Sequence, residues 1–572
     1  EGFKQEYSNS STNSHLNYGE QITAFRSMIK HLVLKGKVLA VVSGYNSHDD
    51  WANGKESLNI PANFFDDLRI PYKKRPPVIY NGGVLNVHVG EDSPGVKIRL
   101  FHKTAGSGST INPVKPLRKV IIDEKIDRDQ KTPLIVFGGH NHSRAGASSE
   151  RKRLPNGKEV QLVYLQNGTV KGLDKNKPDP LAVEKGSAKP QPPGAAVILR
   201  KKPNGEVQVV PTYGNDRSRI LLESEKVLNK AESLHITEEL RQELEYRNGQ
   251  TGFQLQEDES IVAERIGGRE IKSKLYTQLS WRYNIGSLGL PVCIYPFAHY
   301  ESDSSHSDRN FVRELIDDIN NSENTGLLVL QGMISKSVPG RADRVTCLNN
   351  LAQELGEVPA SKRVGIMLDS ILRSDKWNKK IKNETDDSSN YDDDYEDEYN
   401  HAYDYEEPVV TGDYLYYNSD LKGTPLFEGN GNVIFNVGNH RYHFLCIDGT
   451  GNFGSRMDGF LGLMQMDRES MVLNEVITGG NSVIPGSLTL SDRVYISNGW
   501  NCPAKTGRNS HDFIERVPKG GQGVIILPTE REKGLIYGCG SLRETRDTFT
   551  GLTLYQDLLA EGNLKKFNRR NQ

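Results

Sequence analysis

Residues 134–142 read LIVFGGHNH, an apolar run followed by two glycines and two histidines one residue apart. The run Leu134–Phe137 predicts a buried strand, and the glycines predict a tight turn at its end. His140 and His142 can point at a common metal ion from such a turn, because neutral imidazole nitrogen is a ligand for zinc, iron and manganese. The stretch therefore predicts a metal-binding loop that follows a strand.

Two earlier segments repeat this arrangement of an apolar strand and a polar loop. A strand predicted at Val96–Phe101 leads directly to His102, and a strand predicted at Val38–Val42 leads to a loop with Asn46 and His48. A single histidine in a loop is more often a surface or capping residue, so each position is a weak signal. Together, in this order and each after a strand, they are much harder to explain by accident.

Helical and strand patterns alternate along both halves of the chain, which is typical of an α/β fold. Helices are predicted at residues 20–32, with Ile22, Phe25, Ile29 and Leu32 on one face, and at Asn310–Ile319, with Phe311, Leu315, Ile316 and Ile319 on one face. Further strands are predicted at Ala195–Arg200, Pro291–Phe297 and Leu327–Leu330.

The motif order in the first half resembles the calcineurin-like metallophosphoesterase superfamily, most closely its phage and bacterial branch. The later motifs of that family run Gly-Asn-His-Glu/Asp, then His, then Gly-His-x-His, and the resemblance covers most of residues 1–215. It implies hydrolysis of phosphoesters by two ions roughly 3.5–4 Å apart. The resemblance implies a divalent metal (Mn, Fe or Zn), with Asn46, His102, His140 and His142 as ligands and His48 as general acid or phosphate binder.

The first half also departs from the family pattern. The family supplies an Asp-x-His strand and a Gly-Asp motif with a bridging carboxylate, whereas this sequence starts with Glu1-Gly2-Phe3 near the second of these. Tyr45 and Ser47 also interrupt the third motif. We therefore expect a first unit that lacks its N-terminal strand, and three histidines that can hold one ion rather than a catalytic pair.

The second half resembles the same fold without its ligands, so no metal is expected there. The positions of the five family motifs correspond to Phe297–Ser302, Leu330–Met333, Gly365–Trp377, Leu445–Gly449 and Ile477–Ser482. Asp303 and His306 are the polar residues nearby that could still supply a ligand. An unrelated α/β domain remains the alternative interpretation of this half.

These patterns predict two metallophosphoesterase-like α/β sandwiches with central mixed sheets in tandem. The expected domains are residues 1–217 and 290–572, joined by a helical, charged connector at 218–289. Residues 383–407 are acidic and rich in tyrosine, and we interpret them as a surface insertion that could attract cations or a basic partner.

Composition restricts the partners and the location that we expect for this protein. The chain has 72 basic and 74 acidic residues, which argues against strong sequence-independent binding to nucleic acid but leaves a local patch open. No apolar run approaches the roughly 20 residues of a membrane helix, and no signal peptide is visible. We expect a cytoplasmic or virion-associated protein without a membrane partner. Five cysteines without CxxC spacing favour a reducing compartment.

Three functional hypotheses follow. The first is a non-catalytic structural or scaffolding protein, for example a phage virion or assembly component, whose partners are other proteins or copies of itself. The second is a metal-dependent phosphoesterase or nuclease that obtains the missing motifs from an upstream segment or another chain. The third is a phosphate- or nucleotide-binding module that holds one metal through His102, His140 and His142.

Overall fold

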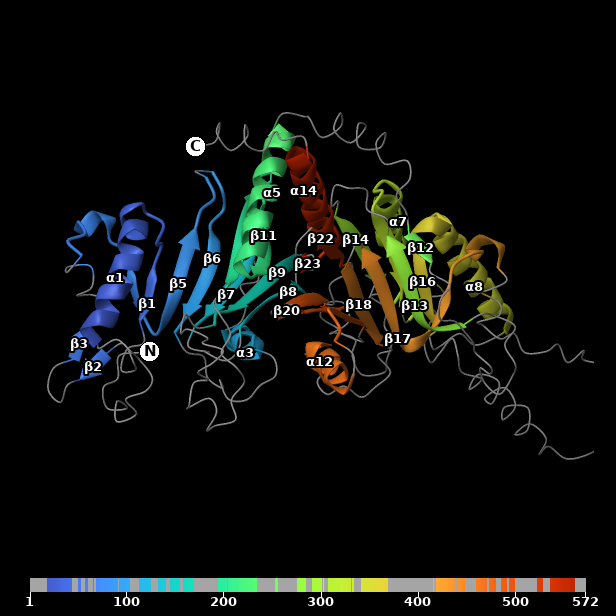
Figure 1. Ribbon diagram of the computed structural model, residues 1–572, viewed down its shortest axis with the longest axis horizontal. Helices are drawn as coiled ribbons and strands as arrows, with labels where there is room; N and C mark the ends of the chain where they lie inside the picture. The colour runs from blue at the N-terminus through green and yellow to red at the C-terminus, as the bar shows by residue number, and fades with distance from the viewer. Residues whose placement is uncertain are drawn as a thin grey trace, which may run out of the picture. The chain divides into compact units, whose positions relative to one another are not determined.

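A computed structural model shows a mixed α/β protein with a six-strand mixed sheet and an eleven-strand mixed sheet (Figure 1). The chain forms two compact units: unit 1 is Glu1–Leu222 with Leu488–Ser491, and unit 2 is Glu223–Ser487 with Asp492–Gln572. The structure describes residues 18–43, 50–52, 57–59, 65, 68–90, 92–102, 113–124, 132–139, 145–154, 158–168, 194–202, 204–233, 253–255, 275–283, 291–300, 302, 307–330, 332–333, 341–368, 415, 418–437, 440–447, 459–470, 473–479, 485–490, 493–498, 522–527 and 535–560.

Unit 1 follows the predicted alternation of helices and strands. The helix predicted at 20–32 and the strands predicted at Val96–Phe101, Leu134–Phe137 and Ala195–Arg200 are confirmed, while the first strand begins at Val41 rather than Val38. Its elements are α1 (Tyr18–Leu34), β1 (Val41–Ser43), β2 (Asp50–Ala52), β3 (Ser57–Asn59), β4 (Val78–Tyr80), β5 (Gly82–Val87), β6 (Val96–Phe101), α3 (Lys115–Glu124), β7 (Leu134–Gly138), β8 (Gly146–Arg153), β9 (Glu159–Gln166), β10 (Ala195–Lys201), β11 (Val207–Tyr213) and the first part of α5 (Asn215–Ser233).

The six-strand sheet has a parallel centre and antiparallel edges. β6, β7 and β9 run parallel, β5 pairs antiparallel with β6, and β8 pairs antiparallel with β9. β20 (Gly486–Leu490) completes the sheet beside β8. β1 and β4 form a separate parallel pair, as β2 and β3 form an antiparallel one.

Alternation of side chains along the strands separates the two faces of this sheet. On one face Ile135, Val163 and Leu165 pack against Val207 and Tyr213 of the hairpin formed by β10 and β11. The other face is covered by α3, which contacts β7 and β9. The sheet is therefore buried on both sides, which explains the unbroken apolar run of β7.

A buried polar network joins α3 to the sheet. Arg118 of α3 forms an ion pair with Glu150 of β8, and the hydroxyl of Tyr164 on β9 donates to the same carboxylate at 2.8 Å. The guanidinium carbon also lies 5.9 Å from the centroid of the Tyr164 ring. Burial, with a smaller contribution from Glu150, raises the pKa of Tyr164 well above its usual value. Removal of any partner would leave a buried charge or hydroxyl unsatisfied.

Unit 2 confirms the strands predicted at Pro291–Phe297 and Leu327–Leu330 and the helix predicted at Asn310–Ile319. The side chain of Asp308 accepts a hydrogen bond from the Phe311 amide at 3.1 Å and so caps that helix. The elements are β12 (Phe253–Leu255), β13 (Leu275–Tyr283), β14 (Val292–Phe297), α7 (Arg309–Asn320), β15 (Thr325–Val329), α8 (Arg341–Gly356), β16 (Arg363–Leu368), β17 (Leu426–Val437), β18 (His440–Ile447), α12 (Gly459–Glu469), β19 (Val476–Gly479), β21 (Arg493–Ser497), β22 (Val524–Leu527), β23 (Leu535–Gly538) and α14 (Leu542–Ala560).

The long strand β17 divides this sheet into two arms. Its residues Leu426–Glu428 pair with β16, and its residues Asn432–Val437 pair with β18. One arm runs in the order β23, β22, β14, β15, β16, and the other in the order β18, β19, β21. Side chains of both arms, such as Val292, Val364 and Phe444, share one buried core. This arrangement gives unit 2 two strand layers with a common apolar interior.

The region 218–289 differs from the predicted helical connector. Helix α5 ends at Ser233, and the structure describes two strands further on, β12 and β13. β13 pairs in parallel with β17 along most of its length, and its residues Leu279 and Trp281 are buried. The sequence LYTQLSWRY has the period-two pattern of a strand, but the charged residues around it favoured the prediction of a helical connector.

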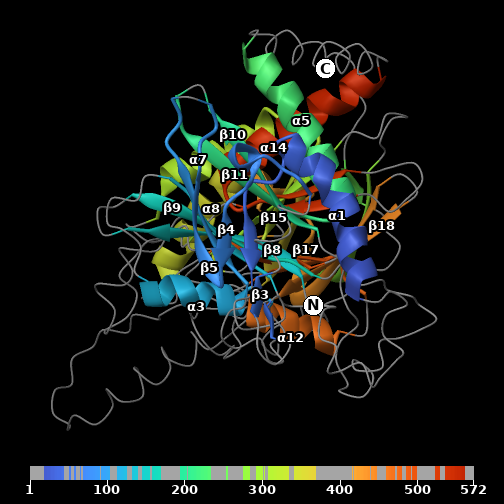
Figure 2. The same cartoon turned by 90° about the vertical axis from the view of Figure 1, so that its left-hand side faces the viewer.

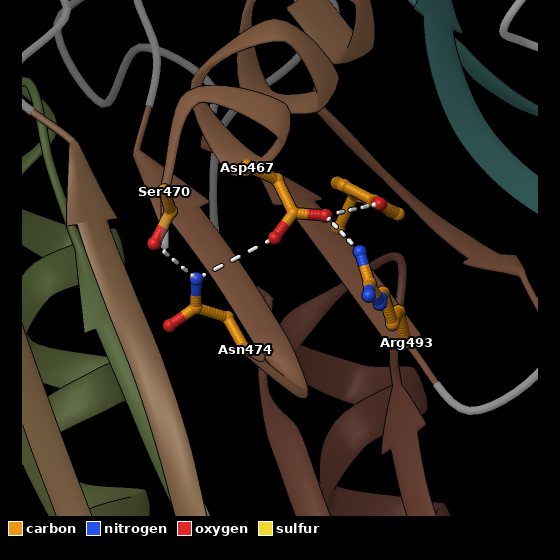
Figure 3. A network of polar contacts seen from close by, with 5 residues as sticks. Asp467, Ser470, Asn474 and Arg493 are labelled. Atoms are coloured by element: carbon orange, nitrogen blue, oxygen red, sulfur yellow. Dashed lines mark hydrogen bonds and ion pairs between the residues drawn. The ribbon is translucent and has the colours of Figure 1, made fainter. Parts of the chain in front are cut away.

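In unit 2, a buried carboxylate fixes the crossover from β18 through α12 to β19 (Figure 3). Asp467 of α12 accepts from Nη1 of Arg493 at 2.6 Å and from the hydroxyl of Tyr495 at 2.8 Å, both on β21. Asn474, just before β19, donates to Asp467 at 3.4 Å and to Ser470 at 3.1 Å. The end of the helix is thereby held against the start of two strands.

We predict that Glu150→Ala lowers the free energy of unfolding of unit 1 by about 3–5 kcal/mol, because it leaves Arg118 buried without its counter-charge. Glu159→Ala is the matched control. It removes the partner of Arg151 from a pair that is 18% and 29% exposed, and should cost less than about 1 kcal/mol. Urea unfolding of both variants measures the difference. Equal losses would show that burial of the first pair does not matter.

A second prediction concerns alkaline pH. Burial is the largest cause that raises the pKa of Tyr164, Tyr295, Tyr300 and Tyr495. The neutral phenol is favoured in the folded state, so its stabilisation is complete below the unfolded pKa of about 10 and is lost as the pH rises beyond it. Above pH 10, each such tyrosine should lower the free energy of unfolding by up to about 1.4 kcal/mol for every unit that the pH rises. Tyrosinate absorbance should therefore rise together with loss of the folded circular dichroism signal. Ionisation of all tyrosines with the fold intact would contradict this.

Candidate metal centre

The carboxyl ends of several strands of unit 1 meet at one edge through backbone hydrogen bonds. The amide of Asn81 donates to the carbonyl of Ser43, the last residue of β1, at 2.7 Å. The carbonyl of Asn81 accepts from the amide of His102, just after β6, at 2.9 Å. Asn81 has a φ of 58°, a left-handed conformation that asparagine tolerates better than most residues. One residue therefore joins two of the predicted site segments.

The third segment joins the same edge through β7. The amide of Gly139 donates to the carbonyl of Phe101 at 3.0 Å, and Phe101 pairs with Gly138 in the parallel ladder. The side chain of Gln166, at the end of β9, donates to the carbonyls of Gly138 and Gly139 at 3.2 and 2.9 Å. The start of the glycine turn that precedes His140 is thus held beside His102.

Of the predicted site residues, His102 is within the described part of the chain, where it is partly buried at this edge. Asn46, His48, His140 and His142 lie outside the described residues. The structure brings together the residues from which their loops start, namely Ser43, His102 and Gly139.

The edge also carries a buried polar atom that suits a ligand. The hydroxyl of Ser43 is fully buried and has no hydrogen-bond partner in the described part of the chain. Buried hydroxyls are usually paired, and a bound ion or its water would supply a partner. His102 adds an imidazole, a donor that suits zinc, iron or manganese. Ser43 and His102 alone are too few to hold an ion, because the described part of the chain has no group of three or more His, Cys, Asp or Glu side chains that could bind a metal.

The corresponding edge of unit 2 has a different composition. His299 follows β14 with a φ of 53°, and Gly332 follows β15 with a φ of 76°. The imidazole lies so close to Gly332 that a Cβ there would come within 2.5 Å of Nδ1. The glycine is therefore required by its own backbone and by the neighbouring ring. Asp303 and His306 lie outside the described residues.

Apolar groups occupy the neighbouring positions in unit 2. The Phe297 ring is buried and lies 5.7 Å from the ring of Tyr300, and Met333 is fully buried. Cys446 is fully buried on β18, and burial raises the pKa of its thiol, which disfavours the thiolate that a metal would need. Within the described ranges, no group of three or more His, Cys, Asp or Glu side chains could hold a metal. The described part of this edge is thus lined mainly by buried apolar side chains.

The ends of β19 and β21 are closed by internal hydrogen bonds. Asn498 is buried, and its side chain donates to the hydroxyl of Thr478 at 2.9 Å. Gln522 donates to the carbonyl of Ser497 at 2.5 Å. Gly479 has a φ of 145°, and a Cβ there would collide with the carbonyl oxygen of Ile447. These contacts pack the strand ends tightly against each other.

The residues that hold the candidate centre together carry weak signals in the sequence. Asn81 is followed by Gly82 and Gly83, a turn signal that could have marked the left-handed position. Gln166 gave no such signal, because its role depends on the pairing of β7 with β9. Ser43 was noted only as the end of a strand.

Comparisons with protein-family models, with curated proteins and with solved structures gave no match. The described helices include none with the length and apolarity needed to cross a membrane.

We predict that Gly479→Ala destabilises unit 2 by more than about 3 kcal/mol, because the new methyl group meets backbone rather than a side chain that can move. Gly423→Ala is the control. Its φ of 82° is also left-handed, but no atom lies within 4 Å of the added Cβ, so it should cost only about 1 kcal/mol. Thermal or urea unfolding compares the two. A similar loss in both variants would mean that backbone conformation, and not the collision, sets the cost.

Proposed function

We propose that this protein is a non-catalytic structural or scaffolding protein built from two metallophosphoesterase-like units. Unit 1 retains one divalent ion, and unit 2 has exchanged its metal site for packing. Partners are other proteins or copies of this chain, as in a virion or another assembly. One ion held by imidazoles orders the loops of unit 1 without supplying the second ion that phosphoester hydrolysis uses in this family.

The observation that carries the proposal is the apolar filling of the strand ends in unit 2. Phe297, Met333 and Cys446 are buried at positions where the resemblance would require ionised or imidazole ligands. A buried carboxylate or thiolate at such a position costs several kcal/mol unless it is paired. Apolar residues at these positions stabilise the core, and they cannot serve as metal ligands.

The alternative function is a metal-dependent phosphoesterase or nuclease centred on unit 1. It is favoured by the meeting of Ser43, His102 and Gly139 at one edge, which is the arrangement that a metal site between their loops needs. This alternative requires a bridging carboxylate from a segment or chain beyond the ligands that the sequence analysis identified.

Metal content and turnover separate the two functions. We predict about one equivalent of Zn or Mn per chain by elemental mass spectrometry, lost in the triple variant H102A/H140A/H142A. The matched control H31A/H88A/H440A removes three histidines elsewhere and should keep the metal. Hydrolysis of bis(p-nitrophenyl) phosphate should stay at the buffer rate for every variant. Circular dichroism checks that each variant is folded.

Two results would contradict this proposal. Two equivalents of metal with phosphodiester turnover, both lost in H102A/H140A/H142A and kept in the control, would replace the structural proposal by the enzymatic one. No bound metal in any protein would refute the metal site of unit 1.

A further inference from the structure

Exposed apolar side chains of the described chain are concentrated in one part of unit 1. Seven of the ten large hydrophobic side chains that are exposed lie between residues 28 and 84. Tyr72 and Leu39 are the clearest cases, at 85% and 57% exposure. The seven are Met28, Leu32, Leu34, Leu39, Tyr72, Tyr80 and Val84. Single exposed apolar residues are normal, but such a concentration marks an interaction surface.

Basic residues occupy the same two segments. Lys35 and Lys37 follow α1, and Lys73 and Lys74 lie in the short helix at Tyr72–Lys74, all four exposed. No Asp or Glu occurs at residues 21–43 or 68–90. Within the described part of the chain, these four lysines form no ion pair.

The fold brings the two segments together. β1 and β4 are parallel, and the amide of Val41 donates to the carbonyl of Pro77 at 2.9 Å, so the residues that precede both strands lie at the same end. Beneath them, Val33 of α1 and Ile70 belong to one buried cluster, onto which Val38 packs. Helix α1 and strand β4 of this part of unit 1 face the viewer in Figure 2. Arg75 donates to the carbonyl of Ile70 at 2.8 Å, which fixes the short helix to this cluster.

We propose that this surface, formed by Leu34, Lys35, Lys37, Leu39 and Tyr72–Lys74, docks on an anionic phospholipid membrane. Lysines are attracted to the negative surface of such a bilayer, and the apolar side chains between them enter the interface. Peripheral binding of this kind is independent of the metal site. It departs from the expectation of no membrane partner, which rested on the lack of an apolar run long enough to span a membrane and of a signal peptide.

The side chains favour a membrane over a nucleic acid. Proteins that bind single strands present several aromatic rings on which bases stack. Here the apolar members besides Tyr72 are aliphatic, and the Tyr72 ring already has the Arg75 guanidinium 5.9 Å from its centroid. Aliphatic side chains between lysines gain little from a phosphate backbone, whereas a bilayer interface buries them.

Sedimentation of the full chain with unilamellar vesicles tests the proposal. We expect binding to phosphatidylcholine vesicles that contain about a third phosphatidylserine, and none to pure phosphatidylcholine. Each lysine at such a surface contributes a factor of about five to partitioning. K37E/K73E/K74E removes three lysines and adds three negative charges, so it should bind at least about a hundredfold more weakly. The control K115E/K119E/K152E carries the same charge change on exposed lysines elsewhere in unit 1 and should bind as the unmodified chain does.

Two further readouts address insertion and the competing partner. In a Tyr72→Trp variant, the tryptophan emission should shift to the blue when anionic vesicles are added, and L34S/L39S should weaken binding at high salt. Absence of vesicle binding, or equal loss in both triple variants, would overturn the proposal. Binding of a single-stranded oligonucleotide that K37E/K73E/K74E abolishes, without vesicle binding, would assign the surface to nucleic acid instead.

Discussion

The candidate centre of unit 1 depends on a pair of backbone hydrogen bonds made by one residue, Asn81. Its amide holds Ser43 and its carbonyl holds His102, so the ends of β1 and β6 cannot separate while Asn81 keeps its left-handed conformation. Gly139 is fixed to the same edge through the parallel ladder of β6 and β7. Because these bonds are made by the backbone, the edge exists whichever side chains the adjoining loops carry, and a binding site can be gained or lost there without rebuilding the sheet.

The corresponding edge of unit 2 is filled by packed side chains. Parallel strands again end together, but Phe297, Met333 and Cys446 are buried near those ends, and Asn498 bonds internally to Thr478. A buried hydroxyl without a hydrogen-bond partner in the described part of the chain occurs at both edges, at Ser43 in unit 1 and at Ser302 in unit 2. The difference between the two edges therefore rests on the apolar side chains that are buried in unit 2 and on the imidazole of His102 in unit 1.

Much of the sheet structure could be predicted from the sequence, because β7 and β14 are short apolar runs that are buried along almost their whole length. Helix α7 could be predicted because its buried residues form one apolar stripe. The pattern of β13 is visible in the sequence, but its pairing with β17 could not be predicted, since it brings together residues about 150 positions apart. The order of the histidine motifs predicted where the candidate centre begins. The roles of Asn81 and Ser43 arise only once several strands are aligned, and a net charge of −2 conceals the local run of lysines in unit 1.

Anomalous diffraction from crystals grown with Mn²⁺ tests the central claim most directly, because it locates the ion rather than counting it. The account predicts one peak beside His102 and Gly139 in unit 1, and none near His299 and Phe297 in unit 2. Two peaks roughly 3.5–4 Å apart in unit 1 would contradict a single-ion structural site and indicate a catalytic pair. A peak confined to unit 2 would reverse the assignment of the two units.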